Sequence, residues 1–214
     1  MTEPVSSNSD KAFIKTIIDK RILIKNKDSL LVQPKCIFVN KFDENSASKF
    51  AEDMTKAEDT GQDIIPIYID SYGGACDALL HMIDIVQSSS VTVATIAIGK
   101  AMSCGSLLLS AGAEGYRFMG SNSRVMIHEI SAGTGGKVSE IVADTNEFIR
   151  LNEQLFRLMA QNTGHDDNFF LDLIHQKGHA DWFLTANECK NLNIVNHIRI
   201  PKFSVSVDVN MKFS

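Results

Sequence analysis

Apolar residues recur along this chain in two periods, one typical of strands and one typical of helices. Largely apolar runs over residues 64–69 and 91–98 predict buried strands, because each run is short and bounded by polar residues or glycine. Between them, residues 75–86 predict an amphipathic helix, whose apolar residues are Leu79, Leu80, Ile83 and Val86. A chain that alternates strands and helices in this way builds a layered α/β domain.

The same reasoning extends the pattern toward both ends of the chain. Further predicted elements are a strand over 35–39, a surface helix over 45–61, a short alternating strand over 123–128, a long helix over 137–161, a helix opened by a capping box at 185–188 and a closing strand over 194–200. We expect one domain over residues 13–200. A flexible polar tail over 1–12 precedes it, and a strand-like extension over 201–214 follows it.

Composition narrows the class of protein. The 214 residues are 44% hydrophobic, which is enough for a full core in one domain, and no apolar run approaches the ~20 residues of a membrane helix. The net charge of −5 and the scattered basic residues argue against a nucleic-acid partner. The four cysteines lie far apart without metal-ligand spacing, so we expect reduced thiols and no bound metal. The polar N-terminus lacks a secretory signal, which predicts a cytoplasmic protein.

A serine at a predicted strand-to-helix turn is the first candidate for chemistry. Ser103 lies in Gly99-Lys-Ala-Met-Ser-Cys-Gly105, between the apolar run and a small-residue helical stretch over 106–111. Such a turn holds the hydroxyl outward beside free backbone N–H groups, as a nucleophile requires. The alternative interpretation is that Ser103 only caps the following helix, because serine is among the best N-cap residues.

Later segments supply candidate partners for this serine. His128 ends a predicted strand, and Asp181 stands just before an aromatic and apolar run. Serine, histidine and aspartate could form a triad in which the histidine takes the hydroxyl proton and the aspartate orients the imidazole. Rival carboxylates are Asp166, Asp167 and Asp172, which also fit the acidic start of a helix.

Four ordered segments resemble the signature blocks of the Clp protease proteolytic subunit, the ClpP family of serine peptidases. They are Ile69-Asp-Ser-Tyr-Gly-Gly74, Gly99-Lys-Ala-Met-Ser-Cys-Gly105, Arg117-Phe-Met-Gly-Ser-Asn-Ser-Arg-Val-Met-Ile-His128 and Asp181-Trp-Phe-Leu-Thr-Ala186. Four blocks in the family's order are a far more specific signal than any single motif. The resemblance implies an α/β fold, the crotonase-like superhelix of strand-strand-helix repeats. It also implies that the helix over 137–161 projects and packs against another ring.

The resemblance assigns roles to the three candidate residues. It implies that Ser103 is the nucleophile, His128 the general base and Asp181 the carboxylate that orients the histidine. The segment before Asp181 is a few residues longer than is usual in the family.

The resemblance also assigns roles to glycines and to one backbone amide. It implies that the N–H groups of Gly74 and Cys104 form the oxyanion hole, which stabilises the tetrahedral intermediate. Gly73 and Gly133 are expected to border the substrate groove, and residues 133–136 to form a glycine-rich strand near that groove and the ring interface.

Departures from the family pattern indicate a divergent member, of phage or plasmid type, and one of them is that residues 201–214 alternate like an edge strand where the family has a short polar tail. Tyr72 stands where the family usually has proline, so the loop before Gly74 is expected to be less rigid. Ala180 replaces an arginine that pairs across rings. The N-terminal segment lacks the family's lead into its first helix, so the axial loops that gate the pore have no assigned place.

The resemblance implies a serine endopeptidase that degrades unfolded polypeptides. Stacked heptameric rings of the chain would enclose the active sites, and a hexameric AAA+ unfoldase would feed them. The peptidase itself would need no cofactor, because ATP is used only by the unfoldase. Alternatives are a phage head-maturation protease that acts without an unfoldase and a non-catalytic ring subunit. A crotonase-type acyl-CoA enzyme shares the fold but does not need this serine, histidine and aspartate.

Overall fold

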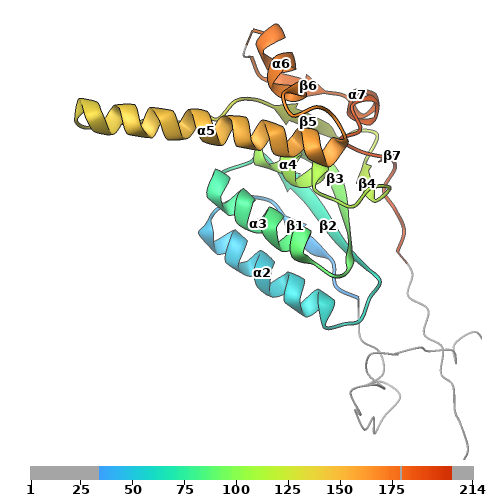
Figure 1. Cartoon of the computed structure of the whole chain (residues 1–214). Helices are drawn as coiled ribbons and strands as arrows, with labels where there is room; N and C mark the ends of the chain where they lie inside the picture. The colour runs from blue at the N-terminus through green and yellow to red at the C-terminus, as the bar shows by residue number, and fades with distance from the viewer. Residues whose placement is uncertain (1–33, 179, 204–214) are drawn as a thin grey trace, which may run out of the picture.

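The computed structural model describes residues 34–178 and 180–203 of the chain. In this part, a sheet of seven strands is covered by helices, and each strand pair is parallel except β5–β6 (Figure 1). The strands are β1 (Ile37–Val39), β2 (Ile64–Ser71), β3 (Thr92–Met102), β4 (Arg117–Met119), β5 (Arg124–Ile127), β6 (Trp182–Leu184) and β7 (His197–Ile198). The helices are α2 (Glu44–Glu58), α3 (Cys76–Ser88), α4 (Cys104–Ser110), α5 (Val138–Thr163), α6 (Phe169–Gln176) and α7 (Ala186–Asn191). The expected α/β class is confirmed, and the structure shows that the sheet is mainly parallel.

The predicted elements are present with shifted ends. Helix α2 begins after Asp43, whose side chain accepts a hydrogen bond from the Ser46 N–H and completes a capping box. The capping box predicted at 185–188 is also formed and opens α7. The closing strand is reduced to β7, because β4 offers it only two paired residues. The tail over 1–12 and the extension from residue 204 onward lie outside the described residues.

Strand β2 separates two apolar layers, because successive side chains of a strand point to opposite faces. Ile65 and Ile67 are fully buried in the main core, which also contains the buried residues of α2 and α3. Tyr68 lies on the other face, where it packs against Ile96 and Phe118. The sheet is thus apolar on both faces, as its nearly continuous apolar runs predict.

Strand β3 changes neighbours along its length. Residues 95–97 pair with β4, and residues 100–102 pair with β5. Gly99 lies between the two pairings with a φ of 73°, a conformation that costs glycine little. The strand therefore leaves β4 at Gly99 and carries its C-terminal end along β5, toward residue 103.

The glycine-rich strand expected at 133–136 is not present. The chain from 128 to 137 connects β5 to α5 without forming a strand, and its second half is exposed. A Cβ added at Gly133 or Gly135 would meet no atom within 4 Å. Extended backbone becomes a strand only when other backbone pairs with it, and within the described residues none pairs with this segment. The expectation is therefore wrong for the single chain.

Helix α5 projects from the body of the molecule (Figure 1). The C-terminal half of this 26-residue helix packs on the core through Leu155 and Met159. Its N-terminal half carries Val138, Val142 and Ile149, which are 79%, 54% and 54% exposed. None of the helices in the described ranges, α5 included, is long and apolar enough to cross a membrane.

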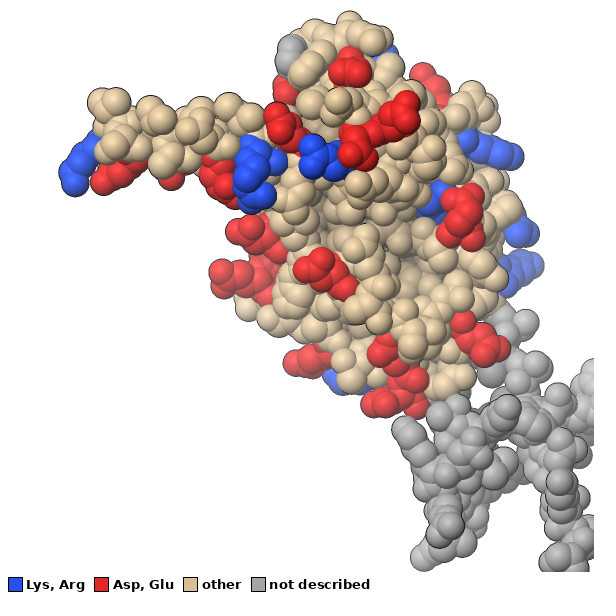
Figure 2. Space-filling model, in the orientation of Figure 1, with Lys and Arg blue, Asp and Glu red and all other residues tan. Residues whose placement is uncertain are grey.

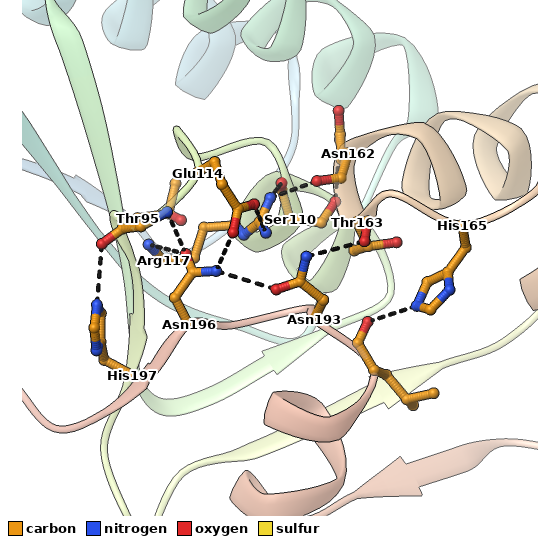
Figure 3. A network of polar contacts seen from close by, with 12 residues as sticks. Thr95, Ser110, Glu114, Arg117, Asn162, Thr163, His165, Asn193, Asn196 and His197 are labelled. Atoms are coloured by element: carbon orange, nitrogen blue, oxygen red, sulfur yellow. Dashed lines mark hydrogen bonds and ion pairs between the residues drawn. The ribbon is translucent and has the colours of Figure 1, made fainter.

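A buried arginine ties β4 to the end of α5 (Figure 3). Arg117 is 2% exposed, donates to the carbonyl oxygens of Ser110 and Asn162, and pairs with Glu114. The Asn196 side chain continues the network by accepting from the Arg117 N–H at 3.1 Å and donating to Glu114 at 3.0 Å. These bonds hold the segment before β7 against β4 and α5.

Acidic and basic side chains are interspersed on the face drawn in Figure 2. Acidic side chains are spread over α2 and α3, and basic side chains lie singly or in small groups. Lys56 pairs with Glu52 one turn earlier on α2, and Lys49 pairs with Asp53. This face offers no continuous basic surface of the kind that binds nucleic acid.

Candidate active site

Ser103 occupies a strained turn between β3 and α4. Its φ and ψ are 54° and −123°, and positive φ is uncommon for a residue with a Cβ. Although Ser103 stands at the N-cap position of α4, its side chain makes no capping hydrogen bond. The hydroxyl is therefore not used to cap the helix. Strained conformations of this kind cluster at functional turns.

The turn at Ser103 is packed against the loop that follows β2. A Cβ at Gly73 would lie 2.7 Å from the Ser103 Cβ and 3.1 Å from its Oγ. A Cβ at Gly74 would lie 2.3 Å from the carbonyl oxygen of Phe42. The paired glycines thus let the loop fit between Phe42 and Ser103, a contact that any larger residue would prevent.

Strand β5 brings His128 to the same end of the sheet. Met102, the last residue of β3, lies opposite Met126 in the parallel pairing. The Ser103 N–H then donates to the Met126 carbonyl at 2.9 Å. His128 follows two residues later, just past the end of β5, so Ser103 and His128 leave neighbouring strands side by side.

The antiparallel pair β5–β6 places Asp181 beside His128. Ile127 lies opposite Trp182 in this antiparallel pair. His128, just after β5, therefore faces Asp181, just before β6. The His128 Nδ1 is 4.0 Å from Asp181 Oδ1. This is longer than a hydrogen bond, as is common in catalytic sites without substrate. His128 is largely buried, with 24% of its side chain exposed, whereas Asp181 is 58% exposed.

The rival carboxylates surround the start of α6. Asp167 accepts from Gln161 at 3.3 Å and lies 3.4 Å from Arg157 Nε. Asp172 is in the first turn of α6, where a negative charge favours the helix dipole. Asp166 stands just before that helix and accepts from the Phe169 N–H through its backbone. The geometry favours Asp181 over these three as the partner of His128.

Ser103 and His128 open into one cavity of about 100 Å³. Its other lining residues are Gly74, Cys76, Leu79, Cys104, Ser106, Leu107, Glu129, Ile130, Ser131, Asn152, Leu155 and Phe156. Gly133 is not among them and lies in the exposed connection to α5. Its place at the substrate groove stays a prediction.

The two residues expected to supply the oxyanion donors, Gly74 and Cys104, both line this cavity. Cys104 is the first residue of α4, so its N–H has no acceptor within the helix. Its thiol donates to the Gly74 carbonyl at 3.3 Å, which joins the glycine loop to the nucleophile turn. The N–H groups of Gly74 and Cys104 therefore belong to two segments held together beside Ser103.

Tyr72 is 75% exposed and fixed from outside the loop. Lys100 lies with its Nζ 4.4 Å from the centre of the Tyr72 ring and 2.7 Å from Asp70 Oδ1. A lysine over an aromatic ring is an attractive contact. This contact gives the loop a support that is different from the rigidity of proline.

One residue that orders the site has no recognisable signal in the sequence. Asn152 of α5 accepts from the Ile130 N–H at 3.0 Å and donates to Glu129 Oε1 at 3.3 Å. It thereby positions the segment directly after His128. An asparagine inside a helix carries no local signal of such a role, because its partners come from another part of the chain.

No group of three or more His, Cys, Asp or Glu side chains within residues 34–178 and 180–203 is arranged to hold a metal ion.

In a comparison with known families, the model of the Clp protease family matches residues 20–201. All four segments that carry the resemblance lie inside this match. The match spans most of the chain.

Proposed function

The chain belongs to the Clp protease family, and we propose that it is a serine endopeptidase that cleaves unfolded polypeptides. One observation carries the proposal. Ser103 is held in a strained conformation with its hydroxyl free of capping, and it lines the same cavity as His128, which has Asp181 within 4.0 Å. A serine beside a histidine that a carboxylate orients is the arrangement that activates a hydroxyl for acyl transfer.

In the proposed mechanism, Ser103 Oγ attacks the carbonyl carbon of the substrate peptide bond. His128 takes the hydroxyl proton, and Asp181 orients the imidazole and stabilises its cation. The N–H groups of Gly74 and Cys104 donate to the oxyanion of the tetrahedral intermediate. His128 then gives its proton to the leaving amine. Water, activated by the same histidine, releases the acyl group from Ser103.

We further propose that copies of the chain form stacked heptameric rings around these sites, in the cytoplasm, and that an AAA+ unfoldase feeds them. Each copy would contribute one domain over 13–200, built as the crotonase-like superhelix of strand-strand-helix repeats. The exposed apolar residues of α5, among them Val142 and Ile149, support a contact with another copy. Ala180 cannot supply the ion pair of an arginine, so rings should associate more weakly than in family members with arginine there.

Replacing the nucleophile tests the chemistry. Ser103→Ala should lower hydrolysis of a fluorogenic peptide by about 10⁴- to 10⁶-fold, because only the attacking oxygen is lost. A fluorophosphonate probe should modify the native chain at Ser103 alone. Ser48→Ala, on the exposed side of α2, is the control and should react as the native chain does. Normal hydrolysis or labelling of Ser103→Ala would refute the proposal.

A further inference from the structure

Two thiols that the proposed mechanism does not use meet at the cavity. Cys76 is the first residue of α3 and Cys104 the first residue of α4, and both line the cavity beside Ser103. The two side chains are joined by a hydrogen bond. The Cys104 sulfur also lies 3.3 Å from the carbonyl oxygen of Gly74, two residues before Cys76, so its single proton can be donated to either acceptor. Cys76 and Cys104 are thus in contact although they are distant in the sequence.

The contact makes Cys76 the reactive thiol of the pair. The hydrogen bond from Cys104 lowers the pKa of Cys76 to about 7, against the opposing effect of burial. The same bond, together with burial, raises the pKa of Cys104. The N-terminus of α3, a helix of 13 residues, adds a favourable field for a thiolate at Cys76. Cys76 is therefore the thiol of the pair that loses its proton more easily, while Cys104 keeps its proton.

The other two cysteines are not activated in this way. Burial raises the pKa of Cys36 and raises that of Cys189 to about 12. Thiolate, not thiol, reacts with peroxides and other electrophiles. Oxidation should therefore begin at Cys76.

We propose that Cys76 and Cys104 are a peroxide-sensitive pair whose disulfide turns the site off. The Cys76 thiolate attacks the terminal oxygen of a hydroperoxide, the O–O bond breaks, and Cys76 becomes a sulfenic acid, while the other oxygen takes a proton from solvent and leaves as an alcohol or water. The Cys104 sulfur then displaces the hydroxyl from Cys76, the S–S bond forms, and water leaves with the Cys104 proton. The two sulfurs are oxidised and the peroxide is reduced. A thiol reductant reverses the step.

The disulfide would alter the oxyanion donors directly. Bonded sulfurs lie about 2.05 Å apart, much closer than hydrogen-bonded thiols, so the α3 and α4 starts must be drawn together. The bond also ends the hydrogen bond from Cys104 to the Gly74 carbonyl. Gly73 is already in close contact with Ser103, so the loop cannot move inward freely. The N–H groups of Gly74 and Cys104 are then no longer aligned on the same oxyanion. Misplacing one such donor lowers the rate about 10²-fold or more.

The test is peroxide treatment of the full chain, followed by mapping of its cysteines without reductant. Trypsin should cut after Lys56, Lys100 and Arg117, which leaves Cys76 and Cys104 on two adjoining peptides. We expect these peptides to be joined, with the loss of two hydrogens, in the native chain and in Cys36→Ser. They should be separate in Cys76→Ser and after reduction. Oxidation of Cys76 to sulfinic acid without the cross-link would overturn the proposal that the two cysteines form a pair.

The effect of the disulfide on activity rests on the proposed function and is measured in assays separate from the peptide map. Each variant is compared with its own reduced form, by peptide hydrolysis and by fluorophosphonate labelling. Oxidation should lower both at least about 10²-fold in the native chain and in Cys36→Ser, but not in Cys76→Ser. A cross-linked chain that keeps its full rate would refute the switch. If even the reduced chain neither cleaves nor labels, the peptidase proposal fails, while the peptide map still decides whether the disulfide forms.

Discussion

At the residue scale, the candidate site depends on two backbone conformations that support each other. Ser103 has a φ of 54°, and a non-glycine residue held in such a region costs about 1–3 kcal/mol. The hydrogen bond from its N–H to Met126 and the close approach of Gly73 hold it there. The conformation is therefore maintained by contacts from two other segments and not by residues adjacent in sequence.

Gly73→Ala tests this support. The new Cβ would lie 2.7 Å from Ser103 Cβ and 3.0 Å from the Met102 carbonyl, at a φ of 107° that a side chain rarely adopts. We expect labelling of Ser103 by a fluorophosphonate to fall at least about tenfold, since a small displacement of reacting atoms costs up to about 10²-fold. Gly135→Ala, which has open space around it, should label normally. Equal labelling of both variants would show that Gly73 does not position the serine.

Asp181→Asn tests the partner of His128 at the same scale. An amide there would favour the wrong imidazole tautomer, so turnover of a short peptide should fall about 10⁴-fold. Asp172→Asn is the matched control and should change turnover little, because Asp172 stands in the first turn of α6. The assignment is wrong if the control is the inactive variant.

At the element scale, α5 does two different things along its length. Its C-terminal half is part of the core, and through Asn152 it also holds the segment after His128. Its N-terminal half leaves apolar side chains in solvent on one stripe, including Val142 and Ile149. An apolar stripe that the described part of the chain does not cover is typical of a contact surface.

Charges on that stripe should weaken assembly without unfolding the chain. Burying a valine or isoleucine contributes about 1.5–3 kcal/mol, so losing each contact should raise the dissociation constant at least about tenfold. We expect Val142→Asp combined with Ile149→Asp to sediment as a smaller species with an unchanged circular dichroism spectrum. Ala143→Asp adds one such charge off the stripe and should sediment as the native chain does. If all variants sediment alike, the stripe is not an interface.

At the scale of the whole molecule, one polar network joins parts that are distant in sequence. Arg117 connects β4 to the end of α5, and Asn196 connects the segment before β7 to both (Figure 3). His165 adds a further tie between the end of α5 and the carbonyl of Leu192 at 3.1 Å. The network closes the fold on the side away from the exposed half of α5.

Removing the buried guanidinium should destabilise the whole chain. Arg117→Ala leaves the carbonyls of Ser110 and Asn162 without their donor, at about 1–3 kcal/mol for each unpaired buried acceptor. At about 2–4 °C per kcal/mol for a chain of this size, the Tm should fall by several degrees in thermal unfolding. Arg124→Ala, an exposed position on β5, is the control and should hold its Tm. An unchanged Tm for Arg117→Ala would mean that water satisfies these carbonyls.

The local pattern of the sequence was enough for the longer strands and helices in their order, the capping box of α7 and the turn at Ser103, but not for the short strands β4 and β6. These features are set by residues within a few positions of one another, because helix and strand periods and caps are short-range properties. The same holds for the apolar character of β2 and β3, which follows from burial on both faces. The four family blocks added the expected roles of the three candidate residues of the site.

Only the tertiary structure decided how distant segments meet. The register of β5 against β6 places Asp181 beside His128. That register cannot be inferred from the spacing of the residues along the chain. The contact of Cys76 with Cys104 and the role of Asn152 also depend on which segments pack together. The strand expected at 133–136 was wrong because a strand needs a partner backbone, which local propensity cannot supply. The chain's own pattern therefore determined its elements and its candidate chemistry, and the pairing of its strands decided which of those groups can act together.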